Sequence, residues 1–291
     1  MNTFRGLGVA MVTPFDADHN VDCSALRNLT RHLINGGVDY LVVMGTTGES
    51  VTLDENEKAL VLETVIDENA GEIPVVLGLG GNDTRSISKK LSNLNTPGVS
   101  GILSVSPYYN KPTQAGIIAH YKALSEASSL PIILYNVPGR TSSNVLPDTT
   151  LRIASDCKNI VAVKEASGNV EQIMRLIKDK PDGFLVISGD DTITLALMAA
   201  GADGVISVVA NAFPTEFRNV VHGELSEARR AHYNLFDIIN LLFVEGNPAG
   251  IKEALKHLNI CENHLRLPLI NVSDETSAKL KAAIEKAGLL C

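Results

Sequence analysis

The sequence predicts an α/β protein, a (β/α)8 TIM barrel with a C-terminal helical appendage. Short runs rich in branched apolar residues recur eight times, and a stretch with helical periodicity follows each run. The runs start roughly 20 to 33 residues apart, enough for a strand, a loop and a helix, and their continuous apolar character fits parallel strands buried on both faces. The predicted strands span residues 7–15, 40–45, 73–80, 101–107, 131–138, 160–167, 184–190 and 204–211.

Polar residues and glycine mark the predicted helix ends. Asp54 and the acidic residues after it precede one helix, and Asp191 precedes another that Gly201 ends. The clearest helices are predicted at residues 58–67, 193–200, 226–243, 251–258 and 274–287. After Asn211 the strand pattern stops, so we expect a barrel domain of residues 1–223 and a C-terminal helical region of residues 224–291 without independent function.

Composition limits the class of protein. The chain has 291 residues, 45% of them hydrophobic and 20% charged, which suits one large globular barrel plus an appendage. A net charge of −8 disfavours a nucleic-acid partner and leaves small molecules as the expected ligands. No apolar window is long enough to span a membrane and the N-terminus lacks the order of a signal peptide, so we predict a cytoplasmic protein without membrane contact.

The cysteines and histidines show no ligand spacing. Cys23, Cys157, Cys261 and Cys291 are scattered without a CxxC pattern, which fits reduced thiols in a reducing compartment. The seven histidines form no HExxH or similar set. We therefore predict no bound metal.

Lys164 is the first candidate for chemistry. It lies near the end of the apolar run at 160–167, where burial would favour the neutral amine and make it a nucleophile toward a carbonyl. The alternative is a lysine that marks the strand end and extends to solvent. The residues at the other strand ends bear on the choice, because in such a barrel they face one pocket.

Those strand ends carry polar residues with two interpretations each. Thr46 and Thr47 lie in a glycine-flanked turn that could hold a small carboxylate or be only a turn. The tyrosines Tyr108, Tyr109 and Tyr135 could relay protons or simply pack. Arg140 could bind a carboxylate or lie solvated at the surface. Asp190 and Asp191 could suggest a metal, but we favour a helix N-terminus.

Taken together, these segments resemble the Schiff-base-forming pyruvate aldolases, the group of N-acetylneuraminate lyase and dihydrodipicolinate synthase. The resemblance runs essentially from end to end and is closest to the synthase branch. It is carried by residues 12–14, 45–50, 107–110, 135–141, 164–168, 188–191 and 243–248. From the residues alone, the inference would stop at a barrel enzyme with a candidate nucleophilic lysine.

The resemblance implies a role for each matching residue. Lys164 would form an imine with pyruvate, and no other cofactor would be needed. Thr46, Thr47, Gly189 and Ile206 would hold or shape the pyruvate site. Tyr135, Thr46 and Tyr109 would form a proton relay, with Tyr109 supplied by a neighbouring subunit of a homotetramer built as a dimer of dimers.

Arg140 would receive the carboxylate of aspartate semialdehyde, the second substrate, in a reaction of lysine and diaminopimelate biosynthesis. That arginine favours the synthase over the main alternative, another pyruvate aldolase such as N-acetylneuraminate lyase or a sugar-acid aldolase. A non-catalytic keto-acid sensor on the same barrel is the other alternative. Retention of Lys164, Tyr135, Tyr109 and Thr46 together counts against the sensor.

The family's regulatory cleft, where some members bind lysine, would correspond to Ser50, Glu55, Lys58, Asn82, Ser86 and Tyr108. Ser50, Asn82 and Tyr108 match that cleft, whereas Glu55, Lys58 and Ser86 stand where lysine-sensitive members use histidines and a glutamate. Lys58 would repel a cationic effector and Ser86 cannot pair with its ammonium group, so we predict weak or absent feedback by L-lysine.

Overall fold

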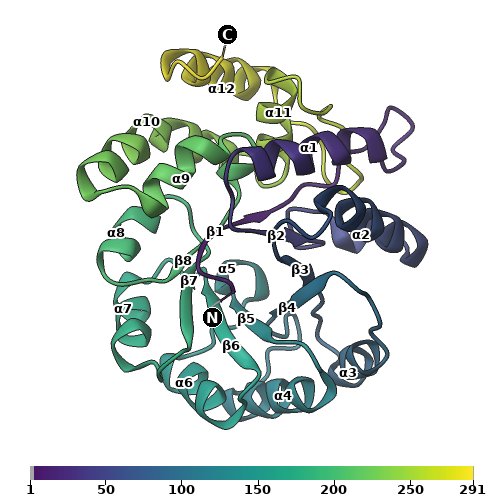
Figure 1. Cartoon of the computed structure of the whole chain (residues 1–291), viewed down its shortest axis with the longest axis vertical. Coiled ribbons are helices and arrows are strands. Elements are labelled where there is room, and N and C mark those ends of the chain that lie inside the picture. The colour runs from purple at the N-terminus through teal and green to yellow at the C-terminus, as the bar shows by residue number, and fades with distance from the viewer. Residues whose placement is uncertain (1–2, 291) are drawn as a thin grey trace. The chain divides into compact units, whose positions relative to one another are not determined.

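The computed structural model describes residues 3–290, and its eight strands follow one another in sequence order around a closed parallel barrel (Figure 1). The strands are β1 (Gly6–Ala10), β2 (Tyr40–Val43), β3 (Val75–Gly78), β4 (Val99–Val105), β5 (Ile132–Asn136), β6 (Ile160–Glu165), β7 (Leu185–Ser188) and β8 (Gly204–Ser207). Each overlaps one predicted strand, so the predicted barrel is confirmed. The strands end before the predicted runs do; after β5 and β8, for example, the runs continue into α5 (Pro138–Thr141) and η2 (Val209–Asn211).

Helices connect the strands and complete the chain. They are α1 (Cys23–Asn35), α2 (Glu55–Asn69), α3 (Thr84–Ser92), α4 (Gln114–Ala127), α5 (Pro138–Thr141), α6 (Pro147–Asp156), α7 (Val170–Asp179), α8 (Thr194–Ala199), α9 (Pro214–His222), α10 (Leu225–Phe243), α11 (Ala249–His257) and α12 (Asp274–Lys286). Two short 3₁₀ helices, η1 (Ser50–Thr52) and η2 (Val209–Asn211), follow β2 and β8. None of the helices within residues 3–290 is long and apolar enough to cross a lipid bilayer.

By its internal contacts the chain divides into two compact units. The first unit contains the residues up to Gly6 and Pro74–Ile206, and the second contains Leu7–Ile73 and the residues from Ser207 onward. The predicted boundary near residue 224 is a different division, and it stays a prediction. The helix α10 begins next to it, at Leu225.

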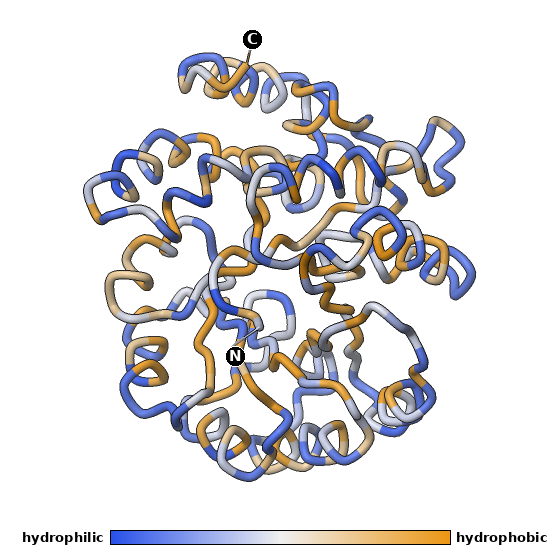
Figure 2. The backbone as a smooth tube through the Cα atoms, in the orientation of Figure 1, coloured by the Kyte–Doolittle hydropathy of each residue, from blue (hydrophilic) through white to orange (hydrophobic). Residues whose placement is uncertain are grey.

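The first unit holds β3 to β7 and β8 up to Ile206, and the pairing of its strands places the residues that matter for chemistry. Tyr135 of β5 is opposite Lys164 of β6, and Lys164 is opposite Ile187 of β7. Because successive side chains of a strand point to opposite faces, residues opposite one another share a face. The helices outside β4–β7 alternate between hydrophobic and hydrophilic residues, as expected for helices with one buried stripe (Figure 2).

The second unit is organised by side chains at strand and helix ends. Asn211 accepts a hydrogen bond from the Val12 amide (3.1 Å) and donates to the Ala10 carbonyl (2.8 Å), which fixes the end of β1. Asp54 caps α2 in a capping box with Glu57, so this helix begins three residues before its predicted start.

The helix predicted at residues 193–200 is present as α8, but neither Asp190 nor Asp191 caps it. The helix α8 begins at Thr194, and its N-cap position is Ile193, which makes no side-chain cap. Asp190 instead accepts hydrogen bonds from the amide (3.0 Å) and hydroxyl (2.6 Å) of Thr192. Asp190 and Thr192 therefore form a local side-chain turn just before the helix.

The cysteines within residues 3–290 are free thiols, namely Cys23, Cys157 and Cys261. Cys291 lies outside the described residues. Over the same span, no three His, Cys, Asp or Glu side chains gather in a way that could hold a metal ion.

The backbone at Gly204, the first residue of β8, packs closely against the backbone of Gly6. Its φ is +154°, and an added Cβ would lie 2.1 Å from the Gly6 carbonyl oxygen. We expect Gly204→Ala to lower the free energy of unfolding by on the order of 3 kcal/mol, measured by chemical denaturation. Gly183→Ala is the matched control, because Gly183 also has a positive φ (+83°) but nothing lies within 4 Å of its added Cβ. Equal losses in the two variants would contradict the steric explanation.

Candidate active site

Lys164 lies at the end of β6 with its side chain only 5% exposed. Its Nζ is 4.3 Å from the centre of the Tyr135 ring. Burial lowers the pKa of the Lys164 amine to about 8; the negative charge of Asp191 opposes this shift, and the positive charge of Arg140 adds to it. Roughly one amine in ten is therefore neutral at pH 7, far more than for an unperturbed lysine, and the neutral form is the nucleophile.

The pKa of Tyr135 is shifted upward, opposite to that of Lys164. Burial raises the pKa of its phenol to about 12, while the Arg140 charge pulls that pKa down. The phenol is consequently protonated at neutral pH and can donate a proton. Its ring lies against the amine of Lys164, so an acid and a nucleophile share one buried site.

Gly189 leaves the space that the Lys164 side chain occupies. A Cβ on Gly189 would lie 3.1 Å from Lys164 Cε and 2.7 Å from the Ala166 Cβ. The Gly189 amide donates to the Glu165 carbonyl (2.8 Å), which continues the contact between β6 and β7. Ile206 is buried in β8 of the same unit. A larger residue at 189 would thus displace the amine or the strand end.

Arg140 and Asp191 are the charges that act on this pair. Arg140 lies in α5 with its side chain exposed, yet its charge shifts the pKa of both Lys164 and Tyr135. Asp191 is buried, and its carboxylate stabilises the charged form of Lys164. This role of Asp191 was not predicted, because an acid before a helix is read from the sequence as part of the helix N-terminus.

Thr46 and Thr47 lie in the second unit, in the turn between β2 and η1. Thr46 is exposed, whereas Thr47 is buried and its hydroxyl accepts a hydrogen bond from Asn247 Nδ2 (3.0 Å). Glu49 ends the turn in a left-handed conformation with φ +50°. The structure therefore links this turn to the C-terminal region, a contact that the sequence analysis did not predict.

A buried ion pair strengthens that link. Lys252 of α11 and Glu49 are fully buried, with 2.5 Å between Nζ and Oε1. Lys252 also donates to the His264 carbonyl (2.8 Å), and the Arg266 amide donates to Glu49 Oε2 (3.1 Å). Burial lowers the Lys252 pKa and the Glu49 charge raises it. Lys252 of α11 thus neutralises the acidic residue of the turn that carries both threonines.

Two further predicted residues of the first unit, Tyr109 and Ser86, are exposed. Tyr109 is 88% exposed with φ +70°, and the backbone carbonyl of its neighbour Tyr108 accepts from Asn82 Nδ2 (3.1 Å). Ser86 is exposed in α3 of the same unit. The relay of Tyr135, Thr46 and Tyr109 stays a prediction.

The remaining residues of the predicted regulatory cleft are in the second unit. Ser50 begins η1, and Lys58 of α2 forms an ion pair with Glu55 (3.1 Å). This pair offsets part of the Lys58 charge that would repel a cationic effector. The grouping of these residues with Asn82, Ser86 and Tyr108 stays a prediction.

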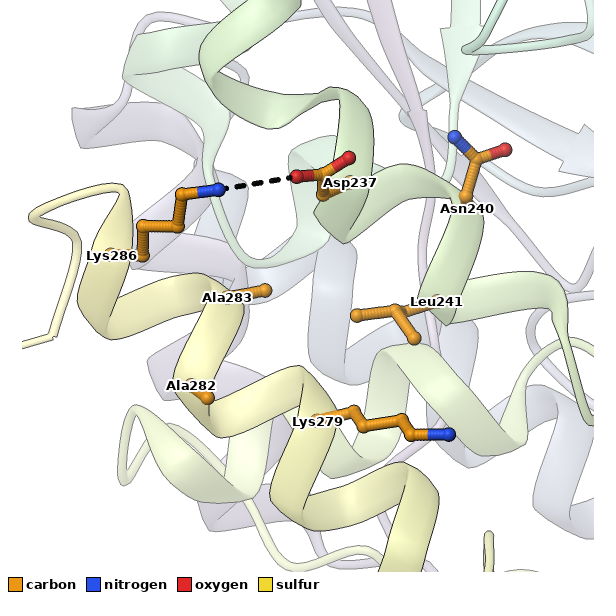
Figure 3. Close-up of a pocket in the computed structure, with 7 residues that line it drawn as sticks. All are labelled: Asp237, Asn240, Leu241, Lys279, Ala282, Ala283 and Lys286. Atoms are coloured by element: carbon orange, nitrogen blue, oxygen red, sulfur yellow. Dashed lines mark ion pairs between the residues drawn. The ribbon is translucent and has the colours of Figure 1, made fainter.

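A hollow between α10 and α12 of the second unit has a different character (Figure 3). It is lined by Asp237, Asn240, Leu241, Lys279, Ala282, Ala283 and Lys286. Lys286 and Asp237 pair across it at 3.7 Å with side chains 82% and 73% exposed. These are solvated surface groups, so the hollow offers no arrangement for catalysis.

Comparison with known proteins agrees with this geometry. The sequence profile of the Dihydrodipicolinate synthetase family matches residues 3–287. The chain belongs to the dihydrodipicolinate synthetase family. This confirms the resemblance seen in the sequence.

Relatives and solved structures of the family match over nearly their whole length. A protein of Flavobacterium psychrophilum named 4-hydroxy-tetrahydrodipicolinate synthase is 51% identical over 284 residues, 96% of this chain and 97% of that protein. The dihydrodipicolinate synthase of Thermotoga maritima superposes with a TM-score of 0.96 at 42% identity, covering 99% of this chain and 100% of that one. A monomeric dihydrodipicolinate synthase variant gives the same TM-score of 0.96 and identity of 42%, with coverage of 99% and 98%.

The lowered pKa of Lys164 predicts the pH dependence of imine formation. Only the neutral amine attacks, so the rate with pyruvate should rise with pH and level off above a midpoint near the pKa of about 8. Borohydride trapping of the adduct at a series of pH values measures this. Arg140→Ala should move the midpoint to higher pH, because the Arg140 charge lowers the Lys164 pKa. An unmoved midpoint in that variant would contradict the assigned electrostatics.

The buried ion pair of the second unit predicts a large effect on stability. Lys252→Met leaves Glu49 buried without its counter-charge, so we expect a loss of roughly 3–5 kcal/mol in the free energy of unfolding. Lys279→Met is the control, because its pair with Glu275 is exposed and worth at most about 1 kcal/mol. Denaturant titration of both variants makes the comparison, and a loss for Lys252→Met as small as the control's would refute the role of the pair.

Proposed function

We propose that this chain condenses pyruvate with L-aspartate 4-semialdehyde through an imine on Lys164 and releases 4-hydroxy-tetrahydrodipicolinate, in lysine and diaminopimelate biosynthesis. The observation that carries the proposal is a buried amine of lowered pKa against the Tyr135 ring, in a chain of the dihydrodipicolinate synthetase family. A pyruvate aldolase needs both features, a nucleophilic amine and an adjacent acid.

The first half of the reaction takes place at Lys164. The neutral amine attacks the ketone carbon of pyruvate, a C–N bond forms, and the former carbonyl oxygen leaves as water. The resulting imine withdraws electrons from the methyl group, which then loses a proton to give an enamine. Lysine itself is thus the electron sink, and the proposal requires no further cofactor.

Tyr135 is the proposed proton donor and acceptor in these steps. Its raised pKa of about 12 keeps the proton on the phenol until the departing oxygen needs it. We propose that Thr46 and Tyr109 continue the relay, and that Thr47, Gly189 and Ile206 shape the pyruvate end. The 88% exposure of Tyr109 suits a residue offered to a second subunit.

Arg140 is the proposed receptor for the second substrate. Its exposed guanidinium can form a bidentate contact with the carboxylate of the semialdehyde, while its charge already reaches Lys164. The enamine carbon then attacks the aldehyde carbon. The substrate amine next attacks the imine carbon, which closes the ring and frees Lys164.

Assembly and location complete the proposal. We infer a homotetramer, a dimer of dimers, that works in the cytoplasm, where its free cysteines suit a reducing environment. A solved relative is a monomeric dihydrodipicolinate synthase variant. Weak or absent inhibition by L-lysine remains our expectation.

The proposed function is tested by pyruvate consumption with purified protein and one of two acceptors. We expect turnover with aspartate semialdehyde and none with N-acetylmannosamine, because Arg140 offers a partner for a carboxylate. The variant Lys164→Ala should lose both turnover and the borohydride-trapped adduct. Turnover with the sugar would keep the imine chemistry but overturn the acceptor, and turnover with neither acceptor would favour a keto-acid sensor.

A further inference from the structure

Glu165 follows the proposed nucleophile directly and points to the opposite face of β6. Its side chain is fully buried, and it receives hydrogen bonds from uncharged donors. Asn136 Nδ2 lies 3.1 Å from Oε1 and 3.0 Å from Oε2, the Ser167 amide lies 2.8 Å from Oε1, and Gln172 Nε2 lies 3.3 Å from Oε2. The proposed mechanism gives this buried carboxyl group no role.

Glu165 belongs to a network of side-chain amides that reaches beyond the strand. Asn136, at the end of β5, donates to Asn144 Oδ1 (2.9 Å) and accepts from the Val145 amide (3.0 Å). Asn144 Nδ2 donates to Gln172 Oε1 (2.8 Å), and Gln172 Nε2 donates back to Asn144 Oδ1 (3.2 Å). The carboxylate of Glu165 therefore orients the two amides that hold residues 144 and 145.

The segment held in this way follows Arg140 directly. The helix α5 ends at Thr141 and α6 begins at Pro147, so residues 142–146 lie outside any helix or strand. Thr141 is joined to this segment, since its hydroxyl donates to the Ser143 carbonyl (2.8 Å) and accepts from the Ser143 amide (3.2 Å). A shift of the segment would consequently move Arg140.

Lys164 depends much less on this network. Its strand is hydrogen-bonded to β5 on one side and β7 on the other, and both ladders reach residues 164 and 165. Loss of the Glu165 carboxylate should therefore release the segment after Arg140 while the proposed nucleophile keeps its place. The two halves of the proposed reaction would respond differently.

We propose that Glu165 is a positioning residue for the second substrate: it holds Asn136 and Gln172, and through them the segment after Arg140, so that the guanidinium meets the acceptor carboxylate. This inference rests on the proposed function. It assigns specificity for the acceptor to a residue that touches neither substrate.

The acid itself is required, because every described contact of its side chain is with a donor. Glu165→Gln keeps the shape but turns one acceptor oxygen into an NH2 group that faces an amide donor. Gln172 contacts Glu165, so the two residues can be swapped. The double variant Glu165→Gln with Gln172→Glu restores one carboxylate and one amide in the same contact.

The first experiment compares the two halves of the reaction in Glu165→Gln. We expect kcat/KM for aspartate semialdehyde to fall roughly tenfold or more, mainly because KM rises. The rate at which the pyruvate adduct forms, followed by borohydride trapping, should change less than about twofold. The exchanged double variant should recover part of the loss. Glu171→Gln, an exposed neighbour of Gln172 on α7, is the control and should match the unaltered enzyme. Equal loss in both halves would overturn the proposal.

A double-mutant cycle tests whether Glu165 acts through Arg140. In the Arg140→Ala background, Glu165→Gln should reduce kcat/KM for the semialdehyde by less than about twofold further. If the fold-losses of the two single variants multiply in the double variant, Glu165 does not act through Arg140 and the proposal is overturned.

Hydrogen exchange tests the same claim without reference to activity. In Glu165→Gln, the amides of residues 142–146 should exchange faster while those of β6 stay protected. If the unaltered enzyme used no semialdehyde, the acceptor role would fall with the proposed function, and the exchange data would still decide whether Glu165 holds this segment. Unchanged exchange at 142–146 would overturn the proposal in either case.

Discussion

The burial of one amine is the constraint on which the site depends. Lys164 can be nucleophilic only because its surroundings disfavour the ammonium form, and the strand that carries it has to tolerate that cost. The register of β5, β6 and β7 meets this requirement by placing a tyrosine ring beside the amine and a backbone without a side chain at Gly189. The charges of Arg140 and Asp191 then act in opposite directions on the amine's pKa. Burial among uncharged groups therefore has the largest effect on the Lys164 pKa, and the two neighbouring charges have smaller effects.

The sequence predicted the parts of this arrangement that depend on local pattern. Eight apolar runs were enough for the barrel, because a strand buried on both faces leaves a continuous signal. Lys164 stood out for the same reason, as a cation inside such a run. The family resemblance, confirmed by the match over residues 3–287, supplied the substrates, which no pattern of residues could have named.

What the sequence did not predict depends on contacts between distant residues. Asp191 was assigned to a helix N-terminus because an acid before a helix is a common cap, and only the structure shows that α8 has no side-chain cap and that Asp190 bonds Thr192 instead. The partner of Glu49 is 203 residues away in the chain, and no local pattern pairs them. From the sequence, Glu165 is only a polar residue at the end of a strand. Its importance comes from the side-chain amides that converge on it, which only the fold brings together.

The pairing of Glu49 with Lys252 also bears on how the protein is made. The turn that carries Thr46 and Thr47 is synthesised early, whereas its counter-charge on α11 and the Arg266 amide come near the end of the chain. Until translation has passed Arg266, a nascent chain would carry an acidic residue with no partner for its intended buried position, and contacts of such high sequence separation form late. A truncated product would therefore lack a stable threonine turn even if its barrel strands were present. The segment from α11 to Arg266 acts in this sense as a check on synthesis, since only a chain that extends past Arg266 can close the turn.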